Sequence, residues 1–235
     1  MGVLMALSEL GIEPDVVVGT SAGALIGGAW AAGMAPDQIA DRVQDASWSD
    51  FGRPHAPSNL ALIETTALRT NLELIFEQRR IEDLPRRFGA VATDLRRRRP
   101  VLLDRGDAAL AVQASVAVPG VFPPVRGEGG VLVDGVLTSP LPVWAAYALG
   151  ATHTVGVRLR PQVPVGAVAR ARRRVLPIVQ AVPPDVEILV DTTGCSSWSP
   201  RDVPHLIDLG YRAACARLDR HLLDSLRSET SRVAS

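Results

Sequence analysis

The chain has 235 residues, of which 47% are hydrophobic and 21% charged, as in a globular protein with one sizeable core. Its 25 basic and 25 acidic side chains give a formal net charge of zero, which excludes a global field that would attract nucleic acid. Two cysteines are too few for a disulfide framework or a thiolate metal site, and they suit a reducing compartment. Residues 1–9 carry no basic segment, so we expect no signal peptide and a cytoplasmic location.

The first predicted elements are a helix, a strand, a sharp turn and a second helix. Apolar residues at helical spacing predict a helix over residues 3–10, closed by a glycine. The β-branched run at residues 16–18 predicts a buried strand, and the Ala-rich residues 22–32 predict a buried helix closed by Gly33. Residues 16–36 are uncharged and long enough to cross a bilayer, but the glycines and polar residues within them favour a strand, a turn and a helix instead.

The rest of the chain alternates predicted helices and strands. Residues 37–80 form a helical cap region, interrupted by a Pro- and Ser-containing segment at residues 53–59. The four arginines at residues 96–99 indicate a hairpin turn, for which a solvated turn is favoured over a phosphate-binding patch. Such alternation is typical of an α/β sheet covered on both faces. In chain order, the later elements are strands at 88–93 and 100–103, a helix at 107–118, a strand at 131–133, a helix at 142–149, strands at 154–159 and 186–190, and a helix at 203–226.

The sharpest local signal is the pentapeptide Gly19-Thr20-Ser21-Ala22-Gly23, which lies between the first predicted strand and the helix after it. G-x-S-x-G in this context is typical of a nucleophile elbow. Glycine is expected at both ends, because side chains there would collide in the strained turn. The following helix would direct its N–H groups and positive dipole end toward an oxyanion. The alternative is a glycine-rich connection, and a phosphate-binding loop is disfavoured because the chain has no Lys.

A nucleophilic serine needs a base, which is usually histidine. None of the four histidines follows a strand on a tight turn, so each is better explained as a surface or packing residue, although a Ser-His-Asp arrangement through His153 or His205 stays open. Asp134 instead closes an apolar strand and is followed by Gly135, which places a carboxylate where sites form in α/β sheets. An ordinary Asp-Gly turn is the alternative. The other two histidines are His55 and His221.

An ordered series of motifs resembles the bacterial patatin-like phospholipase family over nearly the whole chain. The motifs are G-V-L-x-A-L-x-E-x-G-I at residues 2–12, G-T-S-A-G-A-L at 19–25, A-T-D-L at 92–95, A-S-V-A-V-P-G-V-F-P-P at 114–124, V-D-G at 133–135 and L-P-V at 141–143. This resemblance implies a three-layer α/β fold with a mostly parallel central sheet and a helical cap. It also implies one domain over residues 1–226, incomplete at its N-terminus, followed by a flexible tail at 227–235.

The resemblance further implies a Ser-Asp dyad that cleaves lipid acyl esters. Ser21 would be the nucleophile and Asp134 its proton acceptor, with the Ala22 N–H as one oxyanion donor, and neither a metal nor a cofactor is implied. The expected partners are a lipid or acyl ester substrate and a transiently contacted membrane surface, not nucleic acid, and the oligomeric state is not implied. Residues 119–124 would form an apolar wall of the site. Within the cap, Trp48, Phe51 and Phe76 are candidates for contact with acyl chains, with burial in the core as the alternative.

Two features depart from the family pattern. Val136 stands where family members carry Gly or Ala, and because a branched side chain rarely takes positive φ, we expect an altered turn after Asp134. The opening strand and G-G-x-R-G loop of the family have no counterpart in the chain, which is explained by a misplaced start codon, a shortened piece or a natural remnant. A catalytically impaired lipid-binding or regulatory protein is therefore the alternative function.

Overall fold

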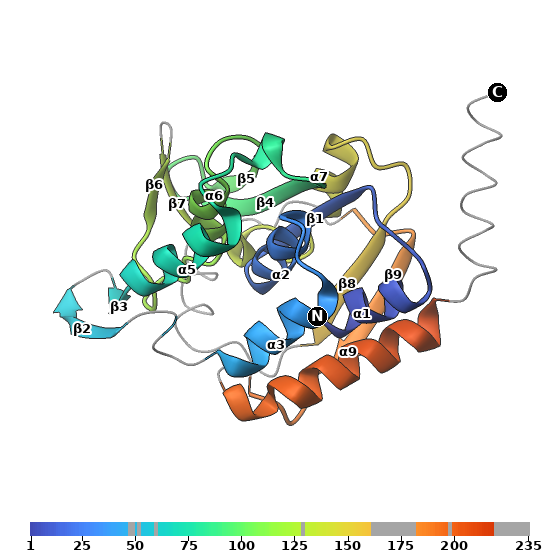
Figure 1. Cartoon of the computed structure of the whole chain (residues 1–235). Coiled ribbons are helices and arrows are strands. Elements are labelled where there is room, and N and C mark those ends of the chain that lie inside the picture. The colour runs from blue at the N-terminus through green and yellow to red at the C-terminus, as the bar shows by residue number, and fades with distance from the viewer. Residues whose placement is uncertain are drawn as a thin grey trace.

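The computed structural model describes residues 1–46, 50, 53–58, 61–127, 130–160, 182–196 and 199–218. Within these ranges, helices and strands alternate along the chain (Figure 1). The helices are α1 (Gly2–Glu9), α2 (Ala22–Ala31), α3 (Pro36–Asp45), α5 (Thr66–Phe76), α6 (Ala108–Ser115), α7 (Val143–Ala148) and α9 (Val203–Arg217), with short 3-10 turns at Ile81–Asp83, Gly135–Leu137 and Pro200–Asp202. The strands are β1 (Val16–Thr20), β2 (Arg53–Ser58), β3 (Ala61–Glu64), β4 (Arg87–Asp94), β5 (Arg99–Leu103), β6 (Val125–Gly127), β7 (Gly130–Asp134), β8 (Val155–Arg160) and β9 (Val186–Asp191).

Two strands of the main sheet meet end to end along β4. The parallel pairing of β1 with β4 ends at the pair Thr20–Val91, and the antiparallel pairing of β7 with β4 ends at the pair Asp134–Ala92. β5 pairs with both Val91 and Ala92 along the other edge of β4, so β1 and β7 share one edge. Their carboxyl ends therefore arrive at consecutive positions of β4 from opposite directions.

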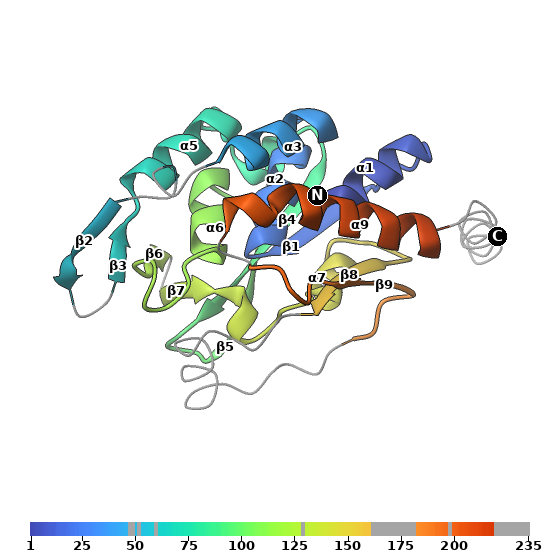
Figure 2. The same cartoon turned by 90° about the horizontal axis from the view of Figure 1, so that it is seen from below.

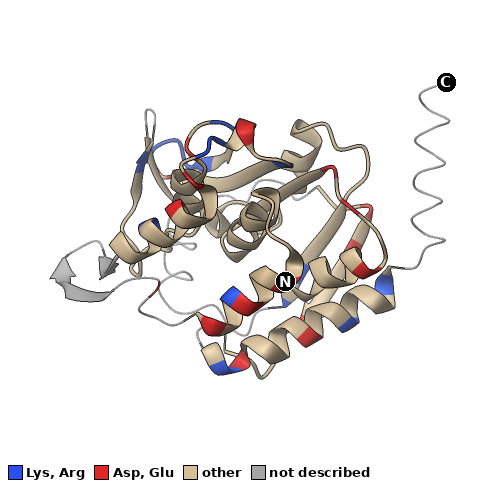
Figure 3. Cartoon of the chain, viewed as in Figure 1, with Lys and Arg blue, Asp and Glu red and all other residues tan. Residues whose placement is uncertain are grey.

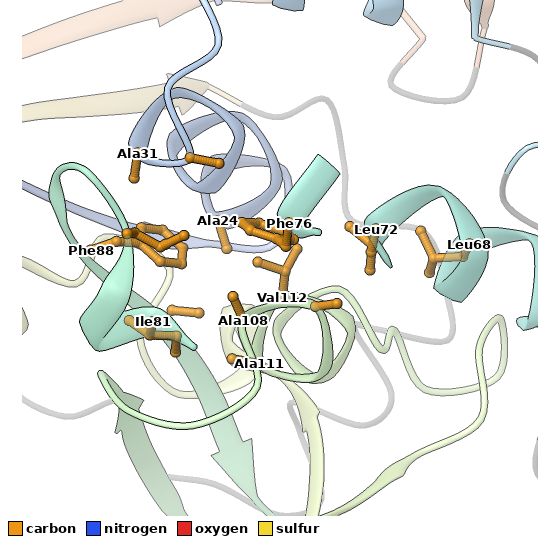
Figure 4. Packing of buried hydrophobic residues seen from close by; sticks show 14 residues of the cluster. Ala24, Ala31, Leu68, Leu72, Phe76, Ile81, Phe88, Ala108, Ala111 and Val112 are labelled. Atoms are coloured by element: carbon orange, nitrogen blue, oxygen red, sulfur yellow. The ribbon is translucent and has the colours of Figure 1, made fainter. Parts of the chain in front are cut away.

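The main sheet is buried on both faces. Phe88 and Ala90 of β4 pack into a core formed with α2, α5 and α6, where Figure 4 shows Phe88 beside Phe76 and Val112. The intervening Gly89 faces the other side, toward Leu149 at the end of α7. Figure 2 shows α2, α5 and α6 on one side of the sheet and α7 on the other. The predicted three-layer α/β class is confirmed. The main sheet, expected to be mostly parallel, is mixed: β1 pairs with β4 in parallel, whereas the pairings β4–β5, β4–β7 and β6–β7 are antiparallel.

A second, two-stranded sheet lies beside the main one. β8 and β9 pair in parallel over their whole length, and the inner face of β9 is buried. The side chains of Val186, Ile188 and Val190 pack against Val3 of α1 and Ala214 of α9. The first and last helices of the described chain are thereby joined by one apolar cluster, as their proximity in Figure 1 shows.

Most predicted elements are confirmed, and three predictions differ from the structure. The helix predicted up to residue 118 ends at Ser115, because Pro119 has no N–H to bond the Ser115 carbonyl. The helix predicted from residue 60 is wrong at residues 61–64, which form β3. β2 lies within the predicted interruption and pairs with β3 as an antiparallel ribbon, an extended geometry that the prolines of β2 favour. β6 was not predicted. The helix predicted over 203–226 is confirmed to Arg217, and its remainder and the tail lie outside the described residues.

No helix in the described part of the chain is long and apolar enough to cross a membrane. The uncharged stretch at residues 16–36 forms β1, a turn and α2, as predicted, and ends at the start of α3. Acidic and basic residues are interspersed on α3 and α9 rather than separated by sign (Figure 3). Neither helix therefore carries charges of one sign alone, although acidic residues outnumber basic ones on α3 and basic residues outnumber acidic ones on α9.

Candidate active site

Ser21 lies at the sharp turn between β1 and α2. Its φ of 56° and ψ of −123° are strained for a residue with a side chain, and Ala22 begins the helix directly after it. A Cβ at Gly19 would lie 2.3 Å from backbone atoms of Gly23 and Ala24, so glycine is required there. A Cβ at Gly23 would meet no atom within 4 Å, and the steric reason predicted for that glycine is wrong.

Asp134 lies directly beside this serine. The Ser21 hydroxyl donates a hydrogen bond of 2.7 Å to Oδ2 of Asp134, although the two residues are 113 positions apart in the sequence. Asp134 is completely buried, whereas Ser21 is half-buried and its neighbours Ala22 and Gly23 are exposed. The meeting of β1 and β7 on β4 explains the contact, because each residue stands at or just past the carboxyl end of its strand.

Burial changes the acidity of the Asp134 carboxyl group. Removal from water disfavours the charged form and raises its pKa to about 6. Hydrogen bonds from the Val136 N–H to Oδ1, at 2.8 Å, and from the Ser21 hydroxyl to Oδ2 oppose this rise. The carboxylate is thus a stronger base than a solvated aspartate and is still largely ionised at neutral pH.

The turn after Asp134 is a short 3-10 turn that includes Val136. Gly135, Val136 and Leu137 form a 3-10 turn, and Val136 is not among the described residues with positive φ. A branched residue fits this turn, because the turn does not require positive φ at position 136. The expected difference from the turn of family members stays a prediction. The Val136 N–H holds one oxygen of Asp134.

Gly135 fills the narrow junction between the two strand ends. A Cβ there would lie 2.2 Å from the Val91 carbonyl oxygen and 3.0 Å from Cγ2 of Thr20. Because the backbone of β4 cannot yield as a flexible side chain would, we expect Gly135→Ala to reduce the free energy of unfolding by about 1–3 kcal/mol. Gly23→Ala is the matched control, since its Cβ has open space and alanine favours a helix. Urea unfolding measures the free energy of unfolding of both variants, and equal values would contradict the claim that no Cβ fits at position 135.

Several hydroxyl groups that the sequence analysis did not select support the pair. The Ser21 N–H donates to Oγ of Ser115 at 3.0 Å, and the Thr20 hydroxyl donates to the Ser139 carbonyl at 2.9 Å. The buried Thr93 hydroxyl donates to the Asp134 carbonyl at 2.9 Å. Polar residues inside otherwise apolar segments are the signal that could have indicated them, because buried polar groups need partners.

The backbone offers donors for an oxyanion at the start of α2. The N–H groups in the first turn of a helix have no partner within that helix, and Ala22 and Gly23 occupy these positions. Both residues are exposed next to the Ser21 hydroxyl, and the positive end of the helix dipole lies there. The role of the Ala22 N–H as an oxyanion donor stays a prediction, and the Gly23 N–H is a second candidate donor.

The other candidates from the sequence lie away from the pair or outside the described residues. His205 is exposed and His153 is half-buried, and no hydrogen bond joins either of them to Ser21 or Asp134 in the described part of the chain. Phe76 is fully buried, so for this residue burial in the core, and not contact with acyl chains, is confirmed. The Ala117 carbonyl, two residues before the 119–124 segment, accepts the N–H of Asp134, and the role of that segment as a wall of the site stays a prediction. Trp48, Phe51, the side chain of His55, and His221 are outside the described residues.

These features define a three-layer α/β protein with a strained serine on a strand-to-helix elbow and a buried carboxylate as its partner. The chain belongs to the patatin-like phospholipase family, whose family model matches residues 1–147, well over half of the chain.

The chain is also similar to three curated proteins. An uncharacterized NTE family protein of Mycobacterium bovis is 34% identical over 161 residues, which are 68% of this chain and 44% of the relative. A second uncharacterized NTE family protein, from Mycobacterium tuberculosis, is 35% identical over 142 residues, 60% of this chain and 24% of the relative. Patatin-like phospholipase domain-containing protein 7 of Rattus norvegicus is 28% identical over 166 residues, 67% of this chain and 12% of the relative. The chain thus spans less than half the length of these relatives.

Proposed function

We propose that the chain is a serine acyl hydrolase that cleaves lipid acyl esters through Ser21 and Asp134. The 2.7 Å hydrogen bond from the Ser21 hydroxyl to the buried Asp134 carboxylate carries this proposal. A hydroxyl is activated when a base within hydrogen-bond reach can take its proton, and this carboxylate is within that reach. Membership of the patatin-like phospholipase family supports acyl esters of lipids as the substrate class.

The reaction proceeds in two halves. Ser21 Oγ forms a bond to the ester carbonyl carbon while its proton passes to Oδ2 of Asp134, and the oxyanion accepts hydrogen bonds from the N–H groups of Ala22 and Gly23. The bond to the alcohol then breaks, and Asp134 returns the proton to the leaving oxygen. Water attacks the acyl-enzyme with Asp134 again as base, which releases the fatty acid and regenerates the Ser21 hydroxyl. No other titratable side chain is needed for this proton balance.

The pH dependence of turnover tests the role of Asp134. Only the ionised carboxylate accepts a proton, and its raised pKa of about 6 lies close to working pH. We expect kcat/KM for a p-nitrophenyl ester to be constant above about pH 7 and to fall about tenfold per pH unit well below pH 6. Circular dichroism at each pH serves as the folding control. A rate that is unchanged down to pH 4 would contradict the assignment.

A fluorophosphonate probe tests the proposal on the chain as it is. We expect covalent labelling of the native protein, with the adduct mapped to the peptide that contains Ser21 and no adduct after heat denaturation. Absence of labelling in the native, folded chain would contradict the hydrolase and favour a catalytically impaired lipid-binding or regulatory protein.

The substrate is expected to be a phospholipid, a lysophospholipid or a neutral glyceride. Long acyl chains reside in membranes or micelles, so turnover would involve transient contact of a cytoplasmic protein with a lipid surface. Measuring the fatty acid released from a panel of phospholipids, lysophospholipids and glycerides distinguishes the three classes. Residues 119–124 are proposed to form the apolar wall that contacts the acyl chain.

A further inference from the structure

The Ser115 hydroxyl connects the backbone of the nucleophile to the central strand. Oγ of Ser115 accepts the N–H of Ser21 at 3.0 Å and donates to the Val91 carbonyl at 2.7 Å. Ser115 is completely buried at the last position of α6. The one donor hydrogen of this hydroxyl and one of its two acceptor positions are occupied by backbone groups, so rotation of the side chain would break both bonds.

This hydroxyl stands where the direct pairing of β1 with β4 stops. Thr20 pairs with Val91, so in a continued parallel ladder the next N–H along this edge, that of Ser21, would be directed at the Val91 carbonyl. Instead the Ser115 hydroxyl bridges these two backbone groups. The backbone of Ser21 is thereby held one hydroxyl group away from β4, in the strained conformation with φ 56° that directs its Oγ to Asp134.

We propose that Ser115 is a positioning residue that sets the place of the nucleophile through the Ser21 N–H, without touching the substrate. The inference rests on the proposed hydrolase function for its kinetic consequences. The Ser21 N–H is already occupied by Ser115, which leaves the N–H groups of Ala22 and Gly23 to bind the oxyanion. Because Ser115 is the last residue of α6 and bonds to Val91 of β4, the position of α6 against β4 also affects where Ser21 lies.

Ser115→Ala is the decisive variant. Without the hydroxyl, the Ser21 N–H is drawn toward the Val91 carbonyl and Oγ moves away from Asp134. We expect kcat to fall about 100-fold, as for a displacement of about 1 Å, with KM within about twofold of the wild type. Loss of the Ser21 hydrogen bond also raises the pKa of Asp134, because that bond lowers it, so the acid limb of the pH profile moves upward. Ser115→Cys keeps a weak donor and acceptor and should restore part of the rate.

Ser139→Ala is the matched control. Ser139 is also a buried serine near the site, and its hydroxyl accepts a hydrogen bond from Trp144 at 2.9 Å, while its contact with Thr20 uses only the backbone carbonyl. We expect this variant to lose stability comparably to Ser115→Ala but to keep the kcat and the pH profile of the wild type. A merely structural role of Ser115 would make the two variants alike.

Amide hydrogen exchange separates this inference from the proposed function. The Ser21 amide should be protected in the wild type and should exchange at least about tenfold faster in Ser115→Ala, while the amides of Val91 and Thr93 keep their protection. Should Ser115→Ala fail to fold, the same comparison is made on Ser115→Cys. A wild-type chain without activity would overturn the proposed hydrolase function, and the exchange of the Ser21 amide would then test the positioning role of Ser115 alone. Unchanged Ser21 protection, or wild-type kcat in an active chain, would overturn the positioning role.

Discussion

Ser21→Ala is expected to lower ester hydrolysis by about 10,000-fold or more and to remove fluorophosphonate labelling completely. The reason is that no acyl-enzyme can form without Oγ, so only direct attack of water remains, with Asp134 as base and the N–H groups at the start of α2 as oxyanion donors. The hydroxyl makes one side-chain hydrogen bond, to Asp134, and is half-buried. The variant should therefore fold, and its loss of activity should come from chemistry alone.

Pre-steady-state kinetics with an excess of a p-nitrophenyl ester measure this effect. The wild type should release a burst of p-nitrophenol equal to the enzyme concentration if deacylation is slow, and Ser21→Ala should release none. Ser139→Ala, a buried serine that does not contact Asp134, is the control. Residual activity above one hundredth of the wild-type rate in a purified Ser21→Ala sample would assign the nucleophile to another side chain.

Asp134→Asn is the second change with a large effect, and it should act oppositely on activity and stability. The amide keeps the shape of the side chain but cannot take a proton from Ser21, so we expect kcat/KM to fall about 10,000-fold. Its oxygen can still accept the Val136 N–H, and its NH₂ group can donate to Ser21 Oγ, so the local geometry should survive.

The stability effect follows from the raised pKa of Asp134. In the folded chain this pKa is about 6, whereas the ordinary value is 3.8. Between these two values the folded chain binds more protons than the unfolded chain, so stability falls as the pH rises through this window and then stays level. The ionised group therefore costs the fold on the order of 3 kcal/mol above pH 7. Asp134→Asn should raise the free energy of unfolding by up to this amount at pH 8 and by little at pH 4.

Asp94→Asn is the matched control for this experiment. Asp94 is also buried on the main sheet. Burial raises the pKa of Asp94, but hydrogen bonds from the N–H and guanidinium of Arg97 and from the Arg96 N–H outweigh it and lower the pKa overall. Its amide variant should therefore be less stable than the wild type at pH 8. Urea titrations at pH 4 and pH 8 measure the change in the free energy of unfolding of each variant. If Asp134→Asn were less stable than the wild type at pH 8, the buried charge of Asp134 would not destabilise the fold.

The two members of the pair could be predicted from local sequence because each stands in a distinctive short pattern. Ser21 is flanked by glycines between a β-branched run and an Ala-rich helix, and Asp134 closes an apolar run before a glycine. Period and turn chemistry are local properties, and they also predicted the hairpin around residues 96–99. The requirement for Gly19, but not for Gly23, depends on how closely the chain folds back at the elbow, and a motif does not contain that information.

The supporting groups could not be predicted in the same way because they depend on which strands are neighbours. Ser115 lies within a motif that the sequence analysis quoted, but its role depends on the contact of α6 with the end of β1. The direction of β7 could not be predicted either, because the sequence of a short apolar strand is the same whether the strand pairs in parallel or antiparallel. Even so, the carboxyl end of that strand was correctly expected to lie at the site, because β1 and β7 both end there.

The consecutive placement of Thr20 and Asp134 opposite Val91 and Ala92 determines where this chain can vary in length. Adding or removing one residue within β7 would invert its alternation and turn the carboxylate into the opposite layer, which no adjustment of side chains could repair. Insertions in the turn at residues 95–98, between β4 and β5, leave those two positions unchanged. Such a connection can therefore vary in length while the distance between the Ser21 and Asp134 side chains stays constant.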